Sequence, residues 1–133
     1  MQSILVVTLA LHVLASVFWA GSTFALARAG GSFAEQLFRP QLGAATVAIL
    51  SGTYLWYLLH VGEFGRMEQV LAIAAGSAVI AFAVQISGGK TLRDLRAKPD
   101  GDVALRRRVA AVQRVASGLL VVTVIAMATA RYV

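Results

Sequence analysis

The chain has 133 residues, of which 59% are hydrophobic and 14% are charged, and its formal net charge is +6. A soluble domain is about 45–50% apolar and about 25% charged, so this composition excludes an ordinary globular domain and predicts an integral membrane protein. The sequence has no cysteine. Disulfides, thiolate metal sites, iron–sulfur clusters and covalent haem attachment through Cys-x-x-Cys-His are therefore excluded.

Four apolar stretches are long enough to cross a bilayer, which takes on the order of 20 residues each. The connections between them are short, so the sequence predicts one all-α domain over residues 1–133, folded as an antiparallel bundle of four transmembrane helices. In chain order, the expected helices cover about residues 3–27, 41–61, 69–89 and 109–130.

The first apolar stretch must be distinguished from a cleaved signal peptide, because residues 25–27 read Ala-Leu-Ala, like a cleavage site. It lacks a basic segment before the apolar run, and the run exceeds the length of about 7–15 residues that is usual for a signal. We therefore interpret this stretch as a membrane-spanning helix.

The basic residues predict the orientation of the bundle. In a four-helix chain the first and third connections share one side of the membrane, and the second connection shares the other side with both termini. All but Arg66 and Arg131 of the 12 lysines and arginines fall on the first side. Because cytoplasmic loops are enriched in basic residues, we expect an inner-membrane protein with both termini periplasmic or extracellular. The same rule explains the positive charge without a nucleic-acid partner.

The start of the fourth stretch is the most basic part of the chain. Three consecutive arginines, residues 106–108, are expected to lie among anionic lipid headgroups. Arg114 lies about a turn and a half further on, from where its side chain can extend back to the headgroups.

His12 and His60 are the only histidines, and each lies in a long apolar stretch. Such a residue is costly inside a membrane and by default marks a functional site. Counted from the expected ends of consecutive antiparallel helices, the imidazoles differ in depth by about 4.5 Å, toward the periplasmic side. This match predicts that the two share a ligand. The alternative is that each only bonds a neighbouring helix or, for His60, lies at the membrane interface.

A b-type haem with both imidazoles as axial ligands, acting in electron transfer, fits this pattern. Small residues would let a flat macrocycle approach and aromatic rings would flank it, although ordinary helix packing explains the same residues. Residues at helical spacing from the histidines are Thr8, Ala15, Ser16 and Trp19 in the first helix and Gly52, Thr53, Trp56 and Tyr57 in the second.

Several further polar residues are candidates for the haem site or for structural roles. Arg66 and Arg131 are candidate partners for the haem propionates or plain interfacial anchors. Tyr57 belongs either to the haem site or to the aromatic belt at the membrane surface. Gln85, in the third helix, is expected to form a hydrogen bond between helices.

Two other functions fit the same residues. Copper could be held by the same two histidines together with Met67, whereas zinc usually takes at least three protein ligands. Alternatively, the chain is a structural subunit of a membrane complex, in which the histidines only bond neighbouring helices. A second copy of the chain is a further candidate partner. No metalloprotease motif, nucleophile elbow or buried carboxylate pair marks an enzyme. A redox role would need a partner such as a quinone or another redox protein.

Residues 12–21 form a His-x6-Trp-x-Gly pattern that resembles the opening helix of the membrane domain in the copper-resistance protein D family. Residues 51–54, Ser-Gly-Thr-Tyr, are similar to a small-residue stretch of that family, and the basic residues 106–114 also fit. This resemblance covers most of the chain and implies a four-helix membrane protein that handles copper. A weaker resemblance to bacterial membrane-bound protoporphyrinogen oxidases, which are associated with b haem, implies that His12 is an axial ligand.

Overall fold

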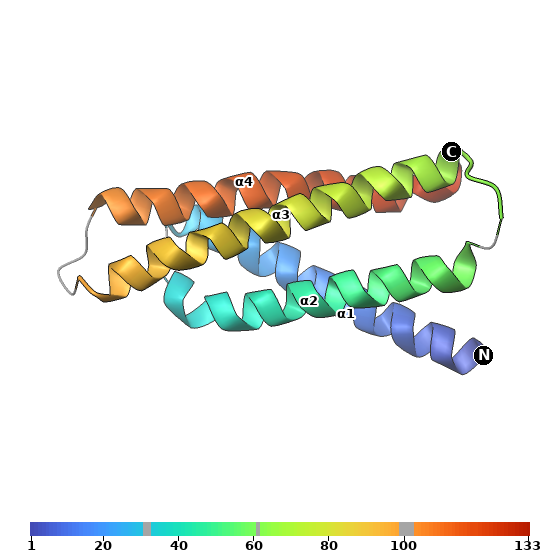
Figure 1. The fold of residues 1–133 in the computed structure, drawn as a ribbon, viewed down its shortest axis with the longest axis horizontal. Helices are drawn as coiled ribbons and strands as arrows, with labels where there is room; N and C mark the ends of the chain where they lie inside the picture. The colour runs from blue at the N-terminus through green and yellow to red at the C-terminus, as the bar shows by residue number, and fades with distance from the viewer. Residues whose placement is uncertain (31–32, 61, 99–102) are drawn as a thin grey trace.

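The computed structural model describes residues 1–30, 33–60, 62–98 and 103–133. These residues form an antiparallel bundle, with both chain termini at the same end (Figure 1). The prediction of an all-α four-helix bundle is confirmed. Its elements are α1 (Gln2–Arg28), α2 (Ala34–Leu59), α3 (Arg66–Arg96), α4 (Val103–Thr129) and a short 3-10 helix, η1 (Ala130–Tyr132).

The outer surface of the bundle is apolar. Leu14 and Val17 of α1, for example, are 69% and 66% exposed. All four helices are long and apolar enough to cross a membrane. A surface of this kind suits hydrocarbon, where the helices satisfy their own backbone hydrogen bonds. Length and composition therefore support a multi-pass membrane protein.

The helices extend beyond the predicted apolar stretches. α2 begins at Ala34, seven residues before the expected start, and includes Pro40. α3 continues to Arg96, beyond the expected end near residue 89. Hydropathy detects only the apolar part of each helix, whereas the polar turns at its ends are helical as well.

Small residues allow the helices to pack closely. α1 packs along α2, and α3 packs along α4. α2 and α3 separate toward the end that carries the termini, and α1 crosses α2 so that its N-terminal part points away from α3 and α4 (Figure 1). Alanines let helix backbones approach each other in a membrane. The main buried cluster comprises Trp19, Ala45, Ala48, Ala78, Ala81, Ala116 and Leu120.

The two ends of the bundle are the terminal end and the basic end. The terminal end carries both chain termini and the connection from α2 to α3. The basic end carries the connections from α1 to α2 and from α3 to α4, and a second buried cluster closes it. This cluster comprises Leu26, Ala34, Leu92 and Val109.

Candidate functional site

His12 lies where α1 crosses α2. Its Nδ1 atom is 2.9 Å from the carbonyl oxygen of Ala48 and 3.1 Å from Oγ of Ser51. A Cβ atom at Gly52 would come within 2.9 Å of the His12 Cε1 atom, so a glycine is needed for the ring to pack here. Because a carbonyl can only accept, Nδ1 is the donor in this contact, which leaves Nε2 as the ring nitrogen that could ligate a metal.

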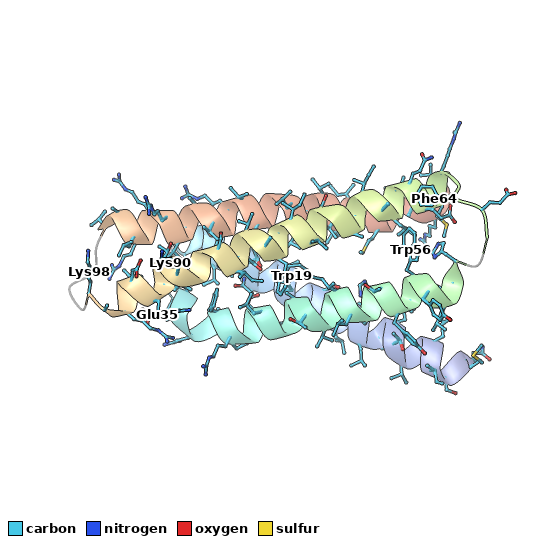
Figure 2. The ribbon with its side chains drawn as sticks, viewed as in Figure 1. Trp19, Glu35, Trp56, Phe64, Lys90 and Lys98 are labelled. Carbon is cyan, nitrogen blue, oxygen red and sulfur yellow. The ribbon has the colours of Figure 1, made fainter. Side chains whose placement is uncertain are left out.

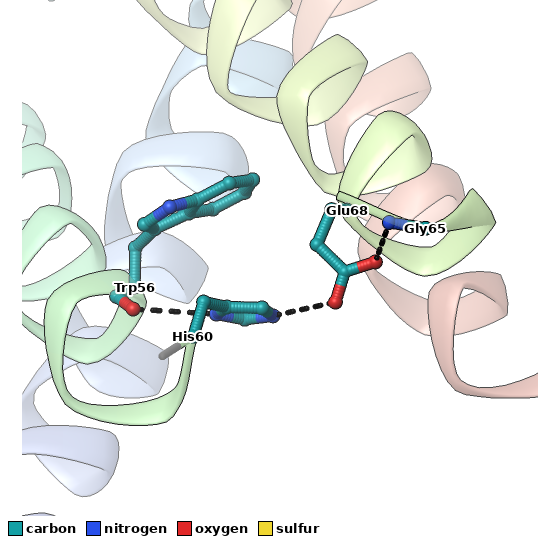
Figure 3. Close-up of polar contacts among 4 residues, drawn as sticks. All are labelled: Trp56, His60, Gly65 and Glu68. Carbon is teal, nitrogen blue, oxygen red and sulfur yellow. Dashed lines mark hydrogen bonds and ion pairs between the residues drawn. The ribbon is translucent and has the colours of Figure 1, made fainter. Parts of the chain in front are cut away.

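His60 lies at the end of α2 and faces α3. Its ring stacks on Trp56, with centroids 4.7 Å apart, and Nδ1 is 3.3 Å from the carbonyl oxygen of Trp56. The Nε2 atom lies 3.6 Å from Oε1 of Glu68 (Figure 3). The other carboxylate oxygen of Glu68 accepts a 2.9 Å hydrogen bond from the backbone N–H of Gly65. Within the described residues, His60 Nε2 is buried and has no hydrogen-bond partner.

The structure does not bring the two histidines to one level. His12 packs against Gly52, and His60 lies eight residues further along α2, which is about 12 Å along the axis. The expected match in depth is not found, because α2 starts at Ala34 rather than near residue 41. Because α2 has these additional turns at its start, His60 lies further from the basic end than the sequence predicted.

The other predicted cofactor residues also lie apart from His12. Arg66 begins α3 at the terminal end. Arg131 lies over the ring of Tyr132, 4.7 Å from its centroid, and donates a hydrogen bond to its hydroxyl group. Tyr57 is 76% exposed, as expected for the aromatic belt. In the described part of the chain, none of these residues forms a hydrogen bond or ion pair with a histidine.

Metal ligands are sparse around the histidines. Met67, the third ligand considered for copper, is 39% exposed. Residues 1–30, 33–60, 62–98 and 103–133 contain no group of three or more His, Asp or Glu side chains that could hold a metal ion. Within those ranges, the pair His60 and Glu68 thus offers two ligand atoms and no third acidic or imidazole ligand.

A buried polar cluster, which we call the amide network, joins all four helices in the half of the bundle toward the basic end. Trp19 points into the bundle (Figure 2), and its Nε1 atom donates to Oε1 of Gln85 at 2.7 Å. The side-chain amides of Gln85 and Gln41 donate to Oγ1 of Thr23 at 2.9 and 2.7 Å. Gln41 and Gln113 pair through their amides at 3.3 and 3.4 Å. The Thr23 hydroxyl donates to the carbonyl oxygen of Trp19 at 2.7 Å.

The amide network is a structural clamp. Each helix contributes at least one side chain, and none of its buried polar atoms lacks a partner in the described residues. The predicted interhelical hydrogen bond of Gln85 is confirmed. The roles of Thr23, Gln41 and Gln113 were missed. The available signal was a glutamine inside the apolar stretch of α4, Gln113, and one at the start of the apolar stretch of α2, Gln41. Gln41 stood at an expected helix boundary, where it looked like a surface residue.

Comparisons of the chain with protein-family models, with curated proteins and with solved structures found no match. The fold and the site define a class: an all-α, four-helix protein of the multi-pass membrane type. Within this class, the chain is distinguished by an imidazole fixed at the crossing of α1 and α2 and by a second imidazole at the end of α2.

Proposed function

We propose that this protein binds a b-type haem in the inner membrane through His12 and takes part in electron transfer or related redox chemistry. The observation that supports the proposal is the contact between His12 Nδ1 and the Ala48 carbonyl oxygen. A carbonyl at Nδ1 orients an imidazole and increases the basicity of Nε2, which is the usual arrangement of a histidine that ligates a metal. When bound, the haem iron would supply reversible one-electron chemistry.

His60 is assigned a separate role in this proposal. Both Nε2 atoms would have to reach one iron for bis-histidine ligation, whereas the two rings lie about two turns apart along α2. His60 is already engaged by Trp56 and faces Glu68. We therefore assign the haem to His12 and treat ligation by both histidines as an outcome of the test.

The proposed orientation follows from the charges at the two ends of the bundle. Arg66 and Arg131 are the basic residues of the terminal end, and the other lysines and arginines lie toward the basic end. The positive-inside rule places the basic end in the cytoplasm. His12, in the half of α1 nearer the terminal end, would then hold its haem toward the periplasmic side, within reach of a membrane quinone or an outer redox partner.

A reduced-minus-oxidised visible spectrum of the protein, expressed with ample haem, tests the proposal. The wild type should show a sharp b-haem band, which His12→Ala should abolish or strongly alter. His60→Ala is the matched control and should keep the band. Loss in both variants would favour ligation by the histidine pair, and absence of a band in the wild type would refute the haem proposal.

Copper handling is the second candidate, and His60 Nε2 favours it, because this buried atom has no hydrogen-bond partner within the described residues. This atom faces a Glu68 oxygen at 3.6 Å, a separation that a cation between them would bridge. Because the chain has one such pair of ligands, metal analysis of copper-loaded protein should find about one equivalent of copper per chain. The variants His60→Ala and Glu68→Gln should each lose the bound copper, whereas His12→Ala should keep it. If neither haem nor copper binds, the role of a structural subunit is favoured.

A further inference from the structure

A basic groove opens at the basic end between α1 and α4. Its volume is about 540 Å³, and it extends over the first three turns of α4 and the backbone just after α1. Three guanidinium groups line it, and no carboxylate belongs to its lining among the described residues. The lining residues are Gly30, Val103, Arg106, Arg107, Ala110 and Arg114.

A second, apolar groove of about 160 Å³ lies further along the same pair of helices. Ala20 and Phe24 of α1 form one wall, and the residues of α4 that form the other wall include Ser117, Val121 and Val124. The guanidinium carbon of Arg28 lies 5.7 Å from the centroid of the Phe24 ring, at the side of this groove that faces the basic end.

The two grooves follow one face of α4. Residues 107, 110, 114, 117, 121 and 124 recur at intervals of three or four, so their side chains share a side of the helix. The arginines occupy the start of this face and the apolar residues continue it toward the terminal end. The seam between α1 and α4 thus has a positively charged groove toward the basic end, followed by an apolar groove toward the terminal end.

We propose that this seam binds one anionic phospholipid, with its phosphate at Arg106, Arg107 and Arg114 and an acyl chain along the apolar groove. Guanidinium groups match phosphate oxygens in charge and geometry. Basic pockets between helices at the cytoplasmic side are typical sites for acidic headgroups. A free phosphate ion would need only the first groove, so the apolar continuation identifies a lipid as the ligand.

Native mass spectrometry of the delipidated protein in detergent tests the headgroup region. The probes are phosphatidylglycerol and phosphatidylcholine with identical acyl chains. The wild type should retain one molecule of phosphatidylglycerol and no phosphatidylcholine. The double variant Arg107→Gln/Arg114→Gln should bind phosphatidylglycerol roughly 25-fold more weakly, because each arginine contributes about fivefold. The matched control, Arg93→Gln/Arg108→Gln, removes two charges from the same end outside the groove and should bind within about threefold of the wild type.

A second pair of variants tests the acyl channel. Val121 lines the apolar groove and is 50% exposed, whereas its neighbour Val122 is 47% exposed and is not part of the lining. Val121→Trp should fill the channel and weaken binding of phosphatidylglycerol, and Val122→Trp should not. Both positions face outward, so neither change should affect folding.

Three results would overturn the proposal. Equal losses in the two arginine pairs would mean that diffuse charge attracts the lipid. Equal binding of phosphatidylcholine would mean that the negative headgroup is not recognised. Unchanged binding in Val121→Trp, with displacement of the lipid by inorganic phosphate at millimolar concentration, would mean that the groove binds phosphate alone.

Discussion

His12 of α1 is fixed to a backbone atom of α2, with its Nδ1 atom 2.9 Å from the carbonyl oxygen of Ala48. The acceptor belongs to the main chain, so no substitution at position 48 removes it directly. The close fit of the ring depends instead on the missing side chain of Gly52, one turn further along α2. Any side chain larger than that of glycine at position 52 should therefore change the orientation of the His12 ring.

Gly52→Ala should displace the His12 ring, because the added Cβ would lie 2.9 Å from Cε1. Overpacking of this kind typically costs about 1–3 kcal/mol, so a lower thermal midpoint in detergent is expected. A shifted or weakened haem band should accompany it. Gly43→Ala is the control in the same helix, because apart from the adjoining helix backbone nothing lies within 4 Å of the new Cβ, and it should be neutral or slightly stabilising. Equal behaviour of the two variants would contradict the packing argument.

Gln85→Leu should destabilise the bundle through the amide network. It leaves the Trp19 Nε1 donor and the Thr23 hydroxyl oxygen without their Gln85 partner. A buried polar group without its partner costs about 1–3 kcal/mol, and hydrogen bonds between membrane helices contribute about 0.6 kcal/mol on average. We expect a loss of about 1–2 kcal/mol in unfolding by denaturing detergent.

Gln69→Leu provides the matched control for Gln85→Leu. Gln69 lies on the same helix, α3, and is exposed near its start. Removing its amide should change the unfolding free energy by no more than about 0.5 kcal/mol. A cost at Gln69 as large as that at Gln85 would show that the amide network does not provide the stabilisation.

The sequence predicted the architecture more accurately than the depth of single residues. Hydropathy identified four helices because each carries more than enough apolar residues to span a bilayer. It could not detect the first turns of α2, where Glu35, Arg39 and Pro40 resemble a loop. Because these turns were left out, the predicted depth of His60 was closer to that of His12 than it is in the structure. The hydrogen-bond partners in the amide network could not be predicted either, because they depend on how each of the four helices is rotated about its axis.

Reporter fusions should show both termini outside the cytoplasm. An alkaline phosphatase fused after Val133 should be active, since this enzyme folds only outside the cytoplasm, and one fused after Lys98 should be inactive. The reason is the concentration of basic residues at the basic end, against Arg66 and Arg131 at the terminal end. The opposite pattern of activities would reverse the orientation and place the lipid site in the outer leaflet.

His60→Phe and His60→Ala should differ in stability, because the ring of His60 packs on Trp56. Such aromatic pairs contribute about 0.5–1.5 kcal/mol, which alanine loses and phenylalanine keeps. Phenylalanine also removes the buried Nε2 atom, which has no hydrogen-bond partner in the described chain and only the 3.6 Å contact with Glu68 to offset its burial. The thermal midpoint of His60→Phe should therefore equal or exceed that of the wild type, with the haem band unchanged. A midpoint as low as that of His60→Ala would show that the imidazole nitrogen is required, and the copper site with Glu68 would then be favoured.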